Sequence, residues 1–357
     1  MVTELQKTGA NVSAQSGREH IVYQTEGLRE SIPQVLELVA NSVLQGRLHP
    51  WDLQPKTDAV KRDISEFQNN AQFVLNEALH YTAFNGQTLG HSLLCPPHNV
   101  ENIDTDTVLA YMDNLFVAPR MSLVGTNISH EELKDMASVL FGSIPSQVSE
   151  RPEGELFTFE KSEYVGGDHQ IHELSGVGAQ AILAYKGPSN ACPTYVAYLV
   201  LSEFLGQTSN KYTGSINHNA SRLAKSVKNV DFGSSFISSY SDNGLFGVYL
   251  AGQNAKEVSQ AVEKAVAELN SVEKNLTEEA LEGAKNHALL KLHNSVSSNI
   301  GLHEYTALFG GVQQQAQAIS KLTAADIKEA AKKLLSSKPT LVSYGNLDGM
   351  IKVRNIQ

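Results

Sequence analysis

A glutamate beside a histidine, Glu19-His20, is the first pair in the sequence that could do chemistry. Such a pair is half of the H-x-x-E-H motif, in which two histidines on one helical face hold zinc and the glutamate activates a bound water. The position four before His20 is Ser16, and residues 20–26 alternate roughly between apolar and polar. Alternation with β-branched and aromatic residues is typical of a strand. We therefore expect a half-buried strand histidine here and no metal ligand.

The densest histidine cluster is His169-Gln170-Ile171-His172-Glu173. If this segment is a strand, residues three apart point to opposite faces, so the two histidines do not converge on one ion. Glu77 and His80 are three apart on an expected helix, but zinc requires at least three protein ligands and no third is indicated. The spacing therefore predicts no metal site in either place.

The stretch SSYSDNGLFG places Ser241 beside Asp242, yet the chain contains no G-x-S-x-G nucleophile elbow. Asp242-Asn243-Gly244 reads as a hairpin turn that supplies a residue with positive φ. The loop at 206–214 lacks the Gly-Lys-Ser/Thr ending of a phosphate-binding loop. We therefore predict no catalytic residue, no cofactor-binding residue and no metal ligand in this chain.

Composition narrows the class of protein. The chain has 357 residues and a formal net charge of −10, so it has no basic stripe for nucleic acid. Its longest apolar run, around 195–205, is broken by Ser202 and Glu203 and is shorter than the ~20 residues that cross a bilayer. The cysteines, Cys95 and Cys192, offer no disulfide framework, which favours a reducing compartment.

An internal repeat sets the organisation of the chain. Residues 106–127 align without a gap with residues 326–347 at an offset of 220, which places Pro119 on Pro339 and Gly125 on Gly345. Each copy reads as a helix, a proline that ends it, and a buried strand that stops at a glycine turn. The two halves of the chain are therefore expected to share one fold.

A second pair of segments, 9–43 and 233–269, supports the repeat. Each reads as a hairpin followed by an amphipathic helix, whose apolar positions in the first copy are Ile32, Val35, Leu36, Val39 and Val43. In the second half, a strand expected within 169–189 and an apolar helix within 191–206 precede the hairpin. The first half has no counterpart, so we expect that roughly 55 to 60 residues of its repeat are absent and that the chain begins inside a domain.

These segments predict an α+β fold of two homologous units, each a mainly antiparallel sheet packed with helices. We place the first unit at 1–145, without its amino-terminal strand and helix, a linker at 146–165, and the second unit at 166–357. Long helical stretches are expected at 57–84 and at 277–309, the latter capped by Thr277.

A duplicated α+β unit of this length resembles the pitrilysin/insulinase-type metallopeptidase superfamily. The resemblance covers essentially the whole chain and rests on YSDNGLFGVY (240–249), ALHYTAF (78–84), FVAPRMSLVG (116–125) and AAKKLLSSK (330–338). Within the superfamily, these stretches are most similar to the core proteins of respiratory complex III. The resemblance implies the same duplicated fold.

The resemblance also implies where a metal site would lie. Active relatives carry H-x-x-E-H on a helix ahead of the first hairpin and a further glutamate ligand in a later helix. The later helix corresponds to 61–70, where Asp63 falls near the ligand column and Glu66 lies nearby. Neither holds zinc alone, and the core proteins are understood to be catalytically silent.

For function, the resemblance implies a non-catalytic subunit of ubiquinol–cytochrome c reductase (complex III) on the matrix side of the mitochondrial inner membrane. Its expected partners are a homologous core protein and other subunits of the complex, through which it associates peripherally with the membrane. No haem, iron–sulfur, quinone or other cofactor, no small-molecule substrate and no nucleic acid is expected. Two alternatives stay open: a zinc-dependent mitochondrial processing peptidase subunit, or its non-catalytic substrate-binding partner, whose run of glycines is not matched at 206–214.

Overall fold

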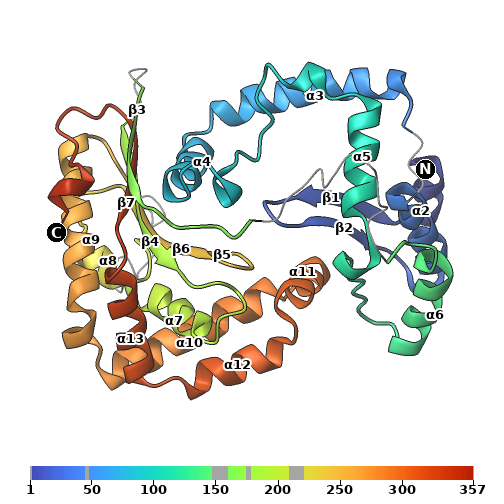
Figure 1. Cartoon of the computed structure of the whole chain (residues 1–357). Helices are drawn as coiled ribbons and strands as arrows, with labels where there is room; N and C mark the ends of the chain where they lie inside the picture. The colour runs from blue at the N-terminus through green and yellow to red at the C-terminus, as the bar shows by residue number, and fades with distance from the viewer. Residues whose placement is uncertain (1, 45–47, 147–159, 174–177, 209–220, 357) are drawn as a thin grey trace. The chain divides into compact units, whose positions relative to one another are not determined.

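The computed structural model describes residues 2–44, 48–146, 160–173, 178–208 and 221–356 (Figure 1). The chain forms two compact units, and each is assembled from three stretches of sequence. Unit 1 takes in residues 1–66, 93–159 and 294–311, and unit 2 takes in residues 67–92, 160–293 and 312–357. Short 3-10 helices occupy Arg29–Ser31, Thr88–Gly90, Val100–Asn102, Ala118–Arg120 and Val353–Asn355.

Unit 2 is built on a five-stranded sheet in the order β3-β7-β4-β6-β5. Its strands are β3 (Gly167–His172), β4 (Ala179–Gly187), β5 (Phe232–Ser239), β6 (Gly244–Gly252) and β7 (Thr340–Gly345). β3 runs parallel to β7, and the other neighbours are antiparallel. The central strand β4 pairs Ile182 with both Tyr249 of β6 and Val342 of β7. The expected α+β fold with a mainly antiparallel sheet is thereby confirmed.

Helices cover both faces of this sheet, and Figure 1 shows α4 (Ala71–Ala83) on one side and α9 (Ala255–Asn275) on the other. Leu79 of α4 is fully buried in a cluster with Ile182 and Ala184 of β4. Because successive side chains of a strand alternate in direction, Leu183 points to the opposite face, which α7, α9 and α13 cover. This explains why β4 is apolar and buried along nearly its whole length.

The remaining helices of unit 2 are α7 (Tyr195–Leu205), α8 (Arg222–Ser226), α10 (Glu278–Ser295), α12 (Val312–Lys321) and α13 (Ala324–Leu335). The predicted cap of α10 is confirmed, because the backbone N–H of Ala280 donates to Thr277 Oγ1 at 3.2 Å. In the described part of the chain, none of the helices combines the length and the hydropathy that a membrane span requires.

Both long helical stretches expected from the sequence are in fact divided. Asn70 accepts hydrogen bonds from the N–H groups of Gln72 and Phe73, so a new helix begins there and residues 57–84 belong to α3 and α4. Ser298 caps α11 in the same way by accepting from Gly301 N–H at 3.1 Å. The side chains of Asn and Ser compete with the helical backbone, so they end one helix and start the next.

Unit 1 has a smaller core. Its elements are α1 (Val2–Thr8), β1 (Asn11–Ser16), β2 (Ile21–Glu26), α2 (Ile32–Leu44), α3 (Pro50–Gln68), α5 (Thr105–Leu115), α6 (His130–Phe141) and α11 (Asn299–Phe309). β1 and β2 form a two-stranded antiparallel sheet with Ser16 opposite Ile21. Among its described residues, the buried apolar side chains are Val35, Leu36, Val39, Ala40, Val43, Ile64, Val100 and Val117. The helical pattern predicted for 32–43 is confirmed, apart from Ile32, which is only partly buried.

The strand expected at the end of the first repeat is not formed. Residues 121–125 belong to no strand, although Met121 has extended dihedral angles. Their counterpart β7 is a strand because it lies between β3 and β4 and bonds to both. A strand is defined by its ladder partners, so the same sequence pattern without them stays irregular.

The two halves of the sequence exchange a helical segment. Residues 67–92 come from the first half yet belong to unit 2, and residues 294–311 come from the second half yet belong to unit 1, where α11 contacts β2. At the offset of 220, residues 67–92 correspond to 287–312, so the exchanged segments are counterparts. The compact units therefore differ from the division into 1–145 and 166–357, which stays a prediction about the repeat. Residues 147–159 of the expected linker lie outside the described residues.

Candidate functional site

The pair first considered for zinc, Glu19 and His20, belongs to no group of three possible ligands among the described residues. His20 lies in the connection between β1 and β2, just before the strand, and is exposed, with Nε2 4.0 Å from Oε2 of Glu19. The strand predicted after it is confirmed as β2, whereas the half-buried histidine is a correction: the turn holds His20 outside the strand.

Four of the other candidate ligands are also exposed. His169 and His172 lie on the edge strand β3, and Asp63 and Glu66 lie on the surface of α3. Within the described ranges, no three His, Cys, Asp or Glu side chains are grouped so as to hold a metal ion. The described residues therefore do not fit the zinc site that the fold superfamily implies.

The structure instead brings together two stretches that the sequence had singled out separately, 78–84 and 240–249. His80 of α4 is 1% exposed, and its Nε2 lies 2.6 Å from the hydroxyl oxygen of Tyr240. Its Nδ1 lies 2.7 Å from the carbonyl oxygen of Asn76. A carbonyl only accepts, so Nδ1 carries the proton and, in the neutral ring, Nε2 accepts from Tyr240. The two residues join α4 to the end of β5 across 160 positions of sequence.

The turn after Tyr240 holds a third segment, residues 160–165. Both carboxylate oxygens of Asp242 accept hydrogen bonds from Ser162, one from its backbone N–H at 2.6 Å and one from its hydroxyl at 2.7 Å. The side-chain amide of Asn243 donates to the carbonyl of Ser162 at 3.0 Å. The turn residues thus bind the irregular segment 160–165 through three polar contacts.

One expectation about this turn is wrong. Neither Asn243 nor Gly244 has a positive φ. The glycine is required for another reason: a Cβ at Gly244 would lie 2.1 Å from the carbonyl oxygen of Pro188. Close backbone approach between β4 and β6, and not a left-handed turn, explains Gly244.

Tyr164 completes this group of contacts. Its hydroxyl donates to the carbonyl of Lys338 at 2.8 Å and accepts from Thr340 Oγ1 at 2.8 Å. Its ring meets Phe84 edge-on, with centroids 6.3 Å apart. Burial raises the pKa of Tyr164 well above its usual range, although the hydrogen bond with Thr340 acts in the opposite direction. We call this group, formed by His80, Ser162, Tyr164, Tyr240, Asp242 and Asn243, the α4 junction.

The α4 junction holds α4, residues 160–165 and the turn after β5 together. Each of its polar side chains is bonded to another protein group, and His80 is enclosed. A general base or nucleophile must instead reach a substrate atom. The sequence had suggested neither the pairing of His80 with Tyr240 nor the binding of Ser162, because no local spacing encodes either contact.

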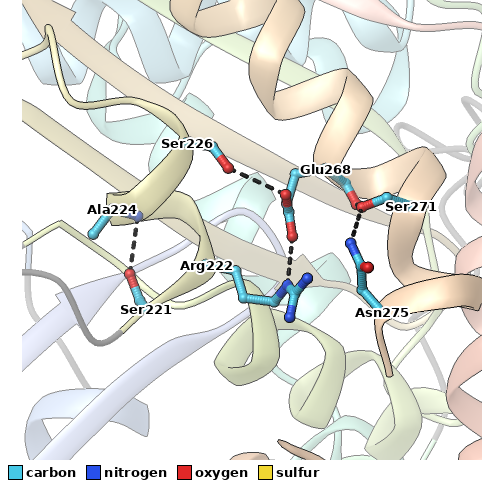
Figure 2. A network of polar contacts seen from close by, with 7 residues as sticks. All are labelled: Ser221, Arg222, Ala224, Ser226, Glu268, Ser271 and Asn275. Carbon is cyan, nitrogen blue, oxygen red and sulfur yellow. Dashed lines mark hydrogen bonds and ion pairs between the residues drawn. The ribbon is translucent and has the colours of Figure 1, made fainter. Parts of the chain in front are cut away.

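A second polar network joins α8 to α9 (Figure 2). Arg222 Nε donates to Glu268 Oε1 at 2.5 Å, and the hydroxyl of Ser226 donates to the other carboxylate oxygen at 3.1 Å. The guanidinium carbon of Arg222 lies 5.2 Å from the ring centroid of Phe204. Ser221 caps α8 by accepting from Ala224 N–H at 3.1 Å. These contacts fix the short helix α8 to the core and, like the α4 junction, are structural.

Two family models match the chain. Residues 1–97 match the insulinase model (peptidase family M16), and residues 102–287 match the model described as the peptidase M16 inactive domain. The second match alone spans more than half of the 357 residues. The chain belongs to peptidase family M16. The superfamily resemblance predicted from the sequence is thereby confirmed.

Among the family M16 relatives is the beta subunit of the mitochondrial-processing peptidase of Lentinula edodes, 28% identical over 97% of this chain and 77% of that protein. The alpha subunit from Solanum tuberosum is 27% identical over 97% of this chain and 70% of that protein. The mitochondrial cytochrome b-c1 complex subunit 2 of Mus musculus is 28% identical over 96% of this chain and 76% of that protein.

A solved structure has the same fold. A chain of complex III2 from Candida albicans, with Inz-5 bound, superposes with a TM-score of 0.85 and covers 97% of this chain and 84% of its own. The sequences are 17% identical, so this likeness shows the fold.

Proposed function

We propose that this family M16 chain is a non-catalytic core subunit of mitochondrial ubiquinol–cytochrome c reductase (complex III). In this role it lies on the matrix side of the inner membrane and pairs with the homologous core protein 1. It contacts other subunits of the complex directly and associates with the membrane only through those subunits. It supports the assembly and the stability of the complex. It binds no cofactor, and its first-half candidates Asp63 and Glu66 hold no zinc.

The observation that carries the proposal is the nearly full-length similarity to cytochrome b-c1 complex subunit 2 of mouse, together with the fold of the complex III2 chain. The match of 102–287 to an inactive peptidase domain supports a role without peptide cleavage.

A second candidate is a subunit of a mitochondrial processing peptidase, either of the zinc endopeptidase or as its substrate-binding partner. The relatives from Lentinula edodes and Solanum tuberosum favour it, since they are 28% and 27% identical to this chain, against 28% for the mouse protein. Sequence identity therefore does not distinguish the two candidate functions. An experiment is needed to distinguish them.

The experiment identifies the partner. The full chain, tagged at its carboxyl terminus, is expressed in mitochondria, the membranes are solubilised in mild detergent, and the tagged complex is isolated by native electrophoresis. We expect a large membrane complex with the absorbance of b-type haem that contains a homologous core subunit. Recovery only as a soluble matrix monomer contradicts the proposal, and recovery in a haem-free heterodimer that cleaves presequence peptides supports the second candidate.

Zinc content tests the absence of catalysis separately. After dialysis, we expect the purified chain to contain much less than one zinc ion per chain. We also expect it to show no phenanthroline-sensitive cleavage of presequence peptides. The variant Asp63→Asn/Glu66→Gln should behave in the same way. One zinc per chain that is lost in this variant, or on mutation of His20 or His172, would refute the assignment.

A further inference from the structure

Each compact unit of this chain contains a segment from the opposite half of the sequence. Here the first half means residues up to 146, and the second half means residues from 160 onward. Residues 67–92 of the first half belong to unit 2, and residues 294–311 of the second half belong to unit 1. The two halves therefore interlock, and each unit is assembled from residues of both.

The segment that the first half contributes lies in the core of unit 2. Its buried apolar residues are Leu75, Leu79, Ala83, Phe84 and Leu89, and they form one cluster with Ile182, Ala184, Leu245 and Val342 of the sheet. α4 contacts β3, β4 and β7, which all belong to the second half. Burial of apolar surface drives the association of proteins as well as their folding. The sheet face under α4 is therefore a surface on which the second half binds the first.

Polar groups of the second half also bind α4. The N–H of Val165 donates to the carbonyl oxygen of Ala83 at 2.8 Å, and the hydroxyl of Tyr240 lies 2.6 Å from Nε2 of His80. Carbonyl groups in the last turn of a helix have no partner within that helix. The second half thus satisfies a backbone group at the end of α4 that the helix itself does not satisfy.

A reciprocal contact holds α11, from the second half, in unit 1. The side-chain amide of Asn299 donates to Oε1 of Glu26 at 2.8 Å, and Nε2 of His303 lies 2.7 Å from Oγ1 of Thr126. α11, all of which is described, has no fully buried residue, so this contact is the weaker of the two. Separation of the halves requires both contacts to open, and while one is closed it keeps the other at a high effective concentration.

We propose that the two halves of the chain are binding partners that hold together without the covalent connection between them. The first half presents the apolar face of α4, and the second half presents the sheet face together with residues 160–166 and Tyr240. This is recognition of an amphipathic helix by an apolar surface, here between two parts of one chain. The binding does not depend on the proposed complex III role.

Separate folding of each half is the alternative. In that case the apolar face of α4 would meet water in the first half, and the sheet face that it covers would meet water in the second. Exposed apolar patches of this kind mark binding surfaces in soluble proteins. The cluster around Leu79 buries both faces at once, which favours binding between the halves.

The test cuts the full chain after it has folded. A recognition site for a specific protease, flanked by glycine and serine residues, is inserted between Pro152 and Glu153, and complete cleavage is verified on a denaturing gel. We expect both fragments to elute together in size-exclusion chromatography at the volume of the uncut chain. Hydrogen exchange followed by mass spectrometry should show α4 as protected as before the cut. Elution as two separate fragments, or loss of protection in α4 on cutting, overturns the proposal.

Two variants of the cleavable chain show whether the α4 contact holds the fragments. Leu75 is fully buried in the exchanged segment, whereas Leu109, in α5 of the same half, is 38% exposed. Leu75→Ala should weaken the association of the cut fragments at least ~tenfold, so that they separate at a lower urea concentration than the fragments of Leu109→Ala. Leu75→Val, which removes less of the side chain, replaces Leu75→Ala if the uncut variant is not folded. Separation of both variants at the same urea concentration overturns the proposal.

Discussion

Replacing Leu79 by alanine tests whether α4, encoded in the first half, belongs to the core of unit 2. Leu79 is 0% exposed and lies in one cluster with Ile182, Ala184 and Val342 of the sheet. The change removes three buried carbon atoms, which at ~0.8 kcal/mol each lowers the free energy of unfolding by about 2.4 kcal/mol. The strands beneath Leu79 are fixed in their ladders and cannot close the space, so a cavity term is added.

The total is about 3 to 4 kcal/mol, within the range of about 2 to 5 kcal/mol for Leu→Ala in protein cores. A domain is stable by about 5 to 15 kcal/mol, so the loss is a large fraction of the whole. For a unit of this size it lowers the melting temperature of unit 2 by about 10 °C. Since ~1.4 kcal/mol is a factor of ten, globally protected amides of β4 and β7 should exchange a few hundred times faster.

Hydrogen exchange of the full chain measures this element by element. Leu290→Ala serves as the matched control, since Leu290 is 56% exposed in the same unit and its loss should cost no more than about 0.5 kcal/mol. We expect Leu79→Ala to accelerate exchange in β4 and β7 and to leave β1 and β2 unchanged. If Leu79→Ala accelerates β1 and β2 instead, or affects β4 no more than Leu290→Ala does, the assignment of α4 to unit 2 is wrong.

Three further predictions concern the α4 junction, a helix cap and the two cores. Tyr240→Phe removes the hydroxyl that bonds Nε2 of buried His80 and should lower the free energy of unfolding in urea by about 1 to 3 kcal/mol. Tyr81→Phe is the control, because the Tyr81 side chain is largely exposed and its change should cost about 0.5 kcal/mol or less. Equal effects of the two changes would argue against the His80–Tyr240 bond. Hydrogen bonds from Thr323 lower the pKa of Asp326, so the stability they contribute is present above the ordinary carboxyl pKa and is lost as pH falls through the lower folded value. Thr323→Ala should therefore cost about 1 kcal/mol of unfolding free energy at neutral pH and less in acid. A cost that stays constant from neutral pH to about pH 2 would contradict this coupling. Amides of β1, β2 and α2 should be less protected from exchange than those of β4, β6 and β7, because few apolar side chains are buried in unit 1, and equal protection in the two units would refute this.

The sequence was sufficient to predict most local structure. The alternation after His20, the heptad-like spacing of Val35, Leu36, Val39 and Val43, and the cap at Thr277 each depend on neighbours within one turn or one hairpin. Such short-range patterns fix which face of an element is buried. The internal repeat predicted the fold class, because two similar segments of one chain are expected to fold into two similar α+β units.

Other features depend on partners distant in sequence, and only the tertiary structure decided them. The apolar face of α4 does not specify which sheet it covers, because hydrophobic burial is not directional, and the structure places it on the sheet of unit 2. Residues 121–125 carry a strand pattern but form no strand, because a ladder requires a neighbour whose backbone is unpaired. Gly244 was assigned to a turn, whereas the approach of Pro188 explains it. In each case the deciding contact joins residues far apart in the chain, and no local periodicity records it.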